Sequence, residues 1–213
     1  MKLINPSPKS VLKKHPEGSI FQGFGENPQY YAAHGWPKGH SGWDILAYQG
    51  APILAVADGQ VINISKDRKA LGGVTVRMFH PQIGLYSGYG HLDTISVIEG
   101  QLIKAGEQIG TMGNTGLIIS GGTPYWGNAP AGKGVHLHLT IAEIEEGKAP
   151  FSFTIKGKRY RVKNLDNGTN GGIDPTPFFA EKPEIPDSTI PLQLKIIELL
   201  RSLIRTFLKE PVA

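Results

Sequence analysis

The order of apolar and polar residues along the chain is that of short strands between tight turns. Residues 136–141 alternate strictly, with Leu137, Leu139 and Ile141 apolar and the positions between them polar. Such alternation predicts a strand with one buried face. Apolar runs at 74–79 and 85–92 predict two more strands, and the run at 151–162 around Lys156-Gly157 predicts a hairpin.

Turn signals divide the remaining apolar runs. Asp58-Gly59 separates the run at 52–56 from the run at 61–64, which predicts a hairpin with Asp-Gly at its tip. Residues 103–110 predict a tight turn between short strands, and residues 20–170 show no helical periodicity. We therefore expect a mainly β fold built from antiparallel sheets.

Changes in composition divide the chain into four segments. Residues 1–19 are polar and proline-containing and predict an extended N-terminal lead-in, which is followed by a main domain at 20–173 and a Pro-rich linker at 174–191. Residues 192–210 predict a C-terminal amphipathic helix, which would dock on the domain, self-associate or contact a membrane surface. Its apolar positions at helical spacing are Leu192, Ile196, Leu199, Leu200, Leu203, Ile204 and Phe207.

The amino-acid composition limits the kinds of metal site and binding partner that the chain can have. The chain has no cysteine among its 213 residues, which excludes disulfides and leaves histidines and carboxylates to hold any metal. The formal net charge of +4 favours an anionic partner, but the basic residues are scattered, which argues against nucleic-acid binding. No apolar run is long enough for a transmembrane segment, and the N-terminus lacks the apolar core of a signal peptide.

Four histidines and one aspartate fall in three glycine-flanked motifs. These are Gly39-His40-Ser41-Gly42-Trp43-Asp44, Tyr89-Gly90-His91-Leu92 and His136-Leu137-His138. The two histidines of the last motif project from the same face of a strand, so one can bind a metal while the other serves a reaction. Two histidines and one carboxylate form a catalytic zinc set with an open position, which leaves the other two histidines for proton transfer and oxyanion stabilisation.

These three motifs, in this order, resemble the M23 (lysostaphin/LytM-type) zinc metallopeptidase family. The resemblance extends over residues 20–145, including the glycines of 106–110 and 113–116. It implies antiparallel sheets that form an open groove and one Zn²⁺ ion per chain. It implies His40, Asp44 and His138 as the metal ligands and His91 and His136 as the catalytic histidines, without deciding which of the two is the general base.

The resemblance also implies a function. The chain would be a zinc-dependent endopeptidase that hydrolyses peptide bonds of bacterial peptidoglycan, in a cross-bridge or a stem peptide, by metal-activated water. Without a signal peptide it would reach the wall through phage lysis, as an endolysin, or through non-classical delivery. One feature departs from the family pattern and bears on substrate specificity. Residues 117–135 form an insertion before the His136-x-His138 motif, which we expect to be a wall of the groove.

Two other functions compete with this one. M23-like domains also occur as non-catalytic activators of other wall hydrolases, but those usually lack ligand residues, and this chain has all of them. A phage structural or tail-associated component is the second rival. Among single residues, His15, His34 and His80 match no motif and are expected to be structural. Five aromatic residues either line the groove or pack in the core: Tyr30, Tyr31, Trp36, Tyr125 and Trp126.

Overall fold

A computed structural model of the chain describes residues 2–33, 35–148, 152–165 and 168–179. The chain divides into a unit of residues 1–179 and a second unit of residues 180–213. The predicted linker beyond residue 179 and the predicted helix at 192–210 lie outside the described residues. No helix in the described part has the length and apolar character needed to cross a membrane.

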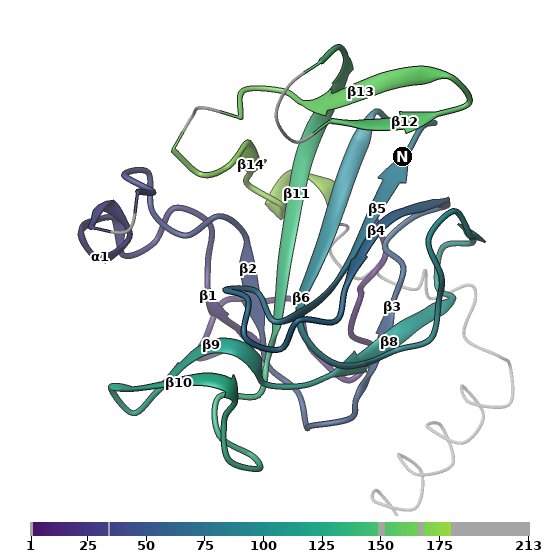
Figure 1. Ribbon diagram of the computed structural model, residues 1–213. Coiled ribbons are helices and arrows are strands. Elements are labelled where there is room, and N and C mark those ends of the chain that lie inside the picture. The colour runs from purple at the N-terminus through teal and green to yellow at the C-terminus, as the bar shows by residue number, and fades with distance from the viewer. Residues whose placement is uncertain (1, 34, 149–151, 166–167, 180–213) are drawn as a thin grey trace, which may run out of the picture. The chain divides into compact units, whose positions relative to one another are not determined.

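The described part is mainly β and antiparallel, as predicted. Short connections join the strands, and one short helix, which the sequence pattern did not predict, lies before β2 (Figure 1). The elements are β1 (Ile20–Gln22), α1 (Pro28–Ala32), β2 (Trp43–Ile45), β3 (Pro52–Leu54), β4 (Gly59–Ser65), β5 (Val74–His80), β6 (Leu85–Ile95), β7 (Leu102–Ile103), β8 (Gln108–Met112), β9 (Thr115–Ser120), β10 (Thr123–Asn128), β11 (Leu137–Glu146), β12 (Phe153–Ile155), β13 (Lys158–Val162), β14 (Gly172–Ile173) and the 3-10 helix η1 (Thr176–Phe178).

Within the described residues, twelve strands form one sheet whose main path runs β1-β2-β11-β6-β5-β4-β7. The two longest strands, β6 and β11, lie side by side at its centre, and β5 pairs with the other edge of β6 (Figure 1). The strands predicted at 74–79, 85–92 and 136–141 are confirmed, and so is the hairpin around Lys156-Gly157, which joins β12 to β13.

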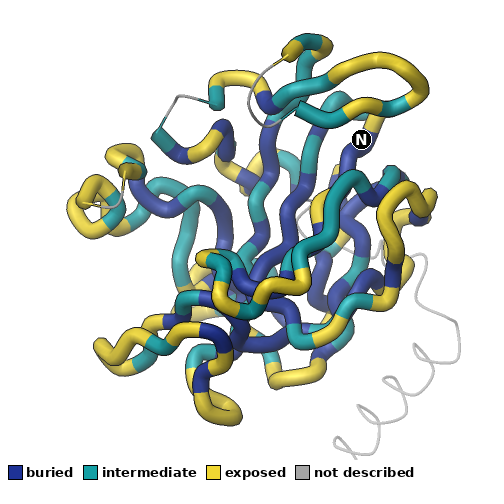
Figure 2. Tube along the Cα trace, viewed as in Figure 1, coloured by how far each residue is buried: buried dark blue, intermediate teal, exposed yellow. Residues whose placement is uncertain are grey.

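The core lies on one face of this sheet. Leu137, Leu139 and Ile141 of β11 are fully buried, and the side chains between them point to the opposite face. Figure 2 shows the buried positions concentrated along the central strands and the exposed ones in the outer loops. Each buried aliphatic side chain contributes about 1.5–3 kcal/mol. A one-residue slip would exchange the two faces of β11, so burial fixes the register that positions the polar residues.

The prediction of a hairpin at Asp58-Gly59 is wrong. Strand β3 pairs with β8, whereas β4 pairs with β5 and β7. The two strands that flank this turn therefore do not pair with each other. Gly59 is needed because a Cβ there would stand 2.6 Å from Nδ1 of His80. The Asp58 carboxylate accepts hydrogen bonds from Ala105 N–H and from the Lys104 ammonium, each at 2.8 Å. The dipeptide therefore serves tertiary contacts and does not form a two-residue hairpin loop.

The segment expected to be an extended lead-in lies against this core. Leu3 is buried and forms an isolated bridge with Phe179, and Ile4 N–H donates to the carbonyl of Val56. Leu54 N–H donates in turn to the carbonyl of Pro6. Apolar burial and backbone hydrogen bonds thus attach residues 3–6 to the sheet.

Candidate metal centre

Three adjacent strands bring the predicted site residues together. Asp44 on β2 stands directly opposite His138 on β11, and His138 stands opposite Gly90 on β6, next to His91. His40 comes from the loop before β2. That loop approaches β11 so closely that a Cβ at Gly42 would overlap the carbonyl of Leu139, so only glycine fits. The structure thus gathers residues that are nearly a hundred positions apart in the sequence.

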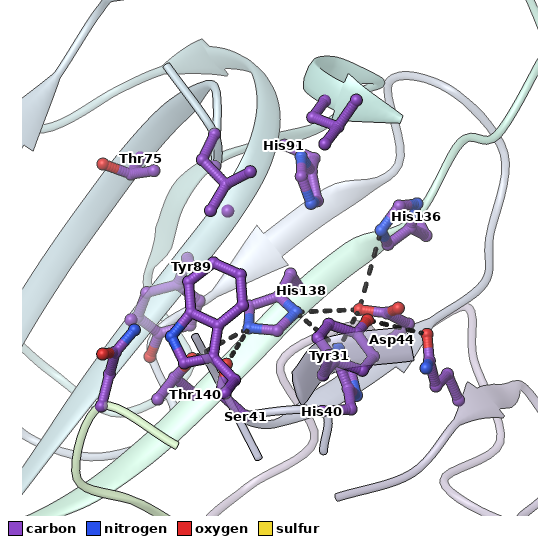
Figure 3. Close-up of a pocket in the computed structure, with 18 of the residues that line it drawn as sticks. Tyr31, His40, Ser41, Asp44, Thr75, Tyr89, His91, His136, His138 and Thr140 are labelled. Atoms are coloured by element: carbon purple, nitrogen blue, oxygen red, sulfur yellow. Dashed lines mark hydrogen bonds and ion pairs between the residues drawn. The ribbon is translucent and has the colours of Figure 1, made fainter. Parts of the chain in front are cut away.

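The three predicted ligands form a compact triangle (Figure 3). Oδ1 of Asp44 lies 2.9 Å from Nδ1 of His138 and 3.2 Å from Nε2 of His40, and the two ring nitrogens are 3.0 Å apart. Donors arranged tetrahedrally about 2.0–2.1 Å from zinc stand about 3.3–3.4 Å apart. The donor types and spacing therefore fit a zinc ion with small outward shifts of the side chains.

The other ring nitrogens of the two histidines predicted as ligands have protein partners. Nδ1 of His40 donates to the carbonyl of Gly23 at 3.1 Å, so Nε2 is the nitrogen that faces the triangle. Nε2 of His138 lies 3.0 Å from the Thr140 hydroxyl and 3.3 Å from the Ser41 hydroxyl, so Nδ1 faces the triangle. Such partners orient ligand histidines and set their tautomers.

The electrostatics of the triangle favour an ionised carboxylate. Burial acts to raise the pKa of Asp44, but the charge of His136 and the hydrogen bonds from His138 and His40 outweigh it and hold the pKa well below its usual value. Burial also lowers the pKa of His138, in opposition to Asp44. An anionic carboxylate and neutral imidazoles are the forms that bind a metal ion.

The two remaining histidines lie beside the triangle. Nδ1 of His91 donates to the carbonyl of Thr115 at 2.7 Å, and Nδ1 of His136 donates to the carbonyl of Gly134 at 2.8 Å. Their ring centroids are 4.6 Å apart, and Nε2 of His136 lies 3.6 Å from Oδ1 of Asp44. Burial, with smaller contributions from His136 and His138, lowers the pKa of His91 to about 3, so the ring is neutral and carries its lone pair at Nε2.

His91 also has an unusual backbone. Its φ is +61°, in the left-handed region that non-glycine residues seldom occupy, and the pairing of β5 with β6 shifts register between Tyr89 and Leu92, the stretch that contains it. Its N–H donates to the carbonyl of Gly72 at 2.8 Å. Strained backbone of this kind concentrates at functional sites.

A groove of about 630 Å³ lies over the triangle. Tyr30, Tyr31 and Trp36 are among its lining residues, whereas Tyr125 and Trp126 are not. Leu117 and Ile119 of β9 also line it, which confirms that the insertion contributes a wall. Tyr31 packs against His40 with ring centroids 5.5 Å apart; burial and the Asp44 charge raise its pKa, so its hydroxyl stays protonated.

Sequence reasoning missed three polar residues of this site. Ser41 and Thr140 contact His138, and Arg77 lines the groove from β5. Thr140 could have been found, because it continues the alternation of His136 and His138 on the same face of β11. His80, by contrast, is fully buried between the Asp58 carbonyl and the Ser87 hydroxyl, in agreement with its predicted structural role.

Comparison with known proteins agrees with this geometry. Residues 38–150, more than half of the chain, match Peptidase family M23. The chain belongs to this family. The matched part contains all five predicted site residues, from the loop that holds His40 through β11.

Relatives of this M23 chain include both activators and enzymes. It is 34% identical over 110 residues to the murein hydrolase activator NlpD of Escherichia coli, covering 52% of this chain and 26% of NlpD. It is 34% identical over 112 residues to the peptidoglycan DD-endopeptidase ShyB of Vibrio cholerae, covering 48% of this chain and 20% of ShyB. The chain thus spans about a quarter or less of these relatives.

Among solved structures, LytU has a TM-score of 0.49 and 25% identity, over 79% of this chain and 89% of LytU. Through NlpD and ShyB, the M23 chain is related to a murein hydrolase activator and to a peptidoglycan endopeptidase.

Proposed function

We propose that this chain is a zinc-dependent endopeptidase that hydrolyses peptide bonds of bacterial peptidoglycan. The observation that carries the proposal is the ligand triangle of His40, Asp44 and His138, with two further histidines that present Nε2 beside it. When bound, a zinc ion polarises a scissile carbonyl and acidifies a water molecule.

The protein's own groups supply the proton transfers. His91 and His136 each donate Nδ1–H to a backbone carbonyl, so in the neutral form each carries its lone pair at Nε2. One of them accepts the proton of the attacking water and later delivers it to the amine that leaves. Once protonated, a ring donates from both nitrogens and can stabilise the negative charge that develops on the carbonyl oxygen. The protonated Tyr31 hydroxyl, at the groove wall beside His40, is a further donor.

Metal analysis combined with a wall-lysis assay tests this function. Purified protein should contain about one zinc per chain and should reduce the turbidity of bacterial walls, and a chelator should stop this loss. Asp44→Ala and His138→Ala should lose both zinc and activity. His91→Ala and His136→Ala should keep zinc and lose about 100-fold or more of turnover. Full lysis by either ligand variant with zinc still bound would contradict the ligand assignment.

A non-catalytic activator is the second candidate, because the relative NlpD is named as one. It makes the opposite prediction in the same assay. An activator would release nothing from walls alone, would accelerate an added wall hydrolase, and would do so equally as Asp44→Ala.

A further inference from the structure

The face of the central sheet opposite the core carries a row of groove residues beside the triangle of His40, Asp44 and His138. Arg77 on β5 stands opposite Gly88 on β6, and Gly88 stands opposite Thr140 on β11. We propose that Arg77 and Tyr86 form a subsite for a carboxylate group of the peptide substrate. This proposal rests on the proposed function, because it assigns a substrate feature to the same groove.

The direction of Arg77 follows from strand alternation. Val76 and Met78 are fully buried in the core, so the positions that alternate with them, Thr75 and Arg77, project to the other face. Both line the groove, and Arg77 is exposed there. Gly88, opposite Arg77, has no side chain to cover the space between them.

Tyr86 brings a second donor to this space. Its hydroxyl lies 2.9 Å from where a Cβ of Gly88 would stand, so the phenol extends over Gly88 toward the row. The charge of Arg77 acts on this hydroxyl, since it opposes the rise that burial causes in the Tyr86 pKa. The hydroxyl forms no hydrogen bond with another described residue. Thr75, two residues before Arg77, likewise has a buried hydroxyl with no described partner.

Arg77 lacks the partner that comparable arginines have. Arg68 pairs with Asp93, Arg161 pairs with Glu145, and Arg159 bonds to the Ser152 hydroxyl. Arg77 forms no ion pair or hydrogen bond with any residue that the structure describes. It is also the sole lysine or arginine among the described residues that line the groove, whose one carboxylate, Asp44, belongs to the metal triangle.

This donor set matches a carboxylate. A guanidinium presents a planar fork of N–H groups that binds both carboxylate oxygens, and a phenol hydroxyl can add a third hydrogen bond. Arg77 and His138 are two strand spacings, about 10 Å, apart across the sheet and two residues, about 7 Å, apart along it, so their backbones are about 12 Å apart. That span corresponds to about three to four residues of extended peptide, which sets the distance of the carboxylate from the scissile bond.

Chemically matched substrates test the subsite. Soluble muropeptides are prepared from bacterial walls, and half of the sample is amidated with carbodiimide and ammonia to convert its carboxylates to carboxamides. Zinc-loaded wild type should cleave the untreated muropeptides with a kcat/KM about ten-fold higher or more, mainly through a lower KM. Arg77→Gln should lose this preference, because its kcat/KM on untreated muropeptides should fall about ten-fold, toward its value on amidated material. Arg77→Lys should keep part of it, because it retains the charge and loses the fork.

The control is Arg159→Gln, which removes another exposed arginine, on β13 and outside the groove lining. It should retain the wild-type preference. An undiminished preference in Arg77→Gln, or equal cleavage of both samples by wild type, would overturn the subsite.

A binding measurement separates this proposal from the proposed function. If zinc-loaded wild type cleaves neither sample, the endopeptidase assignment fails while the subsite is still testable. Metal-free protein is then titrated with both samples, so that a carboxylate cannot bind zinc instead. Tighter binding of untreated muropeptides by wild type, lost in Arg77→Gln and kept in Arg159→Gln, supports the subsite. Equal binding of both samples, or no binding, rejects it.

Discussion

At the scale of single residues, His91 combines a proposed chemical role with a strained backbone. A left-handed conformation costs a residue with a Cβ about 1–2 kcal/mol, and glycine avoids this cost. His91 has φ +61°. We therefore predict that His91→Gly is more stable than His91→Ala by up to about 1 kcal/mol in the free energy of unfolding, measured with denaturant on metal-free protein.

The pair is its own control, because both substitutions remove the imidazole and its bond to the Thr115 carbonyl. Both should be equally poor in wall lysis. If the alanine variant is as stable as the glycine variant, the left-handed backbone of His91 carries no strain.

The sequence alone predicted which residues form the candidate site, but not how their side chains are oriented. The motifs named the five histidine and aspartate residues because their types and order are visible in the sequence. The sequence could not indicate which nitrogen each ring presents, since that depends on distant carbonyls and hydroxyls such as Gly23 and Thr140. Arg77 escaped notice for a similar reason: its role depends on Gly88, which the sheet register places opposite it.

At the scale of elements, the β9–β10 hairpin presents an apolar face. Trp126 pairs with Leu117 and Pro124 pairs with Ile119, so all four side chains share one face of the hairpin. Ile119 is 46% exposed and Trp126 is 60% exposed, and Leu117 and Ile119 line the groove. We predict that the double variant Ile119→Ser/Trp126→Ser raises KM for soluble muropeptides about ten-fold with unchanged zinc content, because it removes apolar contact area for the substrate.

The matched control is Ile98→Ser/Leu102→Ser. It removes two apolar side chains that are 71% and 78% exposed and do not line the groove. Its KM should equal that of wild type. A similar rise in KM for both double variants would mean that the hairpin has no specific role in substrate binding.

Local sequence patterns predicted where strands lie more accurately than they predicted which strands pair with each other. Alternation predicted β11 because every second side chain from Leu137 to Ile141 is buried, and Lys156-Gly157 predicted the hairpin between β12 and β13. The same kind of signal failed at Asp58-Gly59, where Lys104 and His80 make the contacts that explain both residues. Pairing in this sheet joins strands far apart in sequence, such as β2 with β11, so it depends on contacts that no local pattern contains.

At the scale of the whole molecule, buried histidines couple the fold to pH. His80 is fully buried at the end of β5, where Nδ1 donates to the Asp58 carbonyl at 2.9 Å. Burial lowers its pKa, although the Asp58 carbonyl and charge act in the opposite direction. Burial likewise lowers the pKa of His91 and His138. The unfolded chain therefore binds protons on these histidines more readily than the folded chain, so acid favours unfolding.

The lowered histidine pKa values predict how the stability of the metal-free protein changes with pH. A lowered pKa contributes stability that is fully present above the unfolded value of about 6.5 and is lost as pH falls toward the folded value. The free energy of unfolding of metal-free protein should therefore fall between pH 7.5 and pH 5, with each linked proton contributing up to about 1.4 kcal/mol per pH unit. His80→Gln should be less stable at pH 7.5 but should lose less stability on acidification, because one linked proton is gone. His15→Gln, at an exposed position, should keep the wild-type slope. Equal slopes in His80→Gln and wild type would show that His80 is not one of the groups through which acid unfolds the protein.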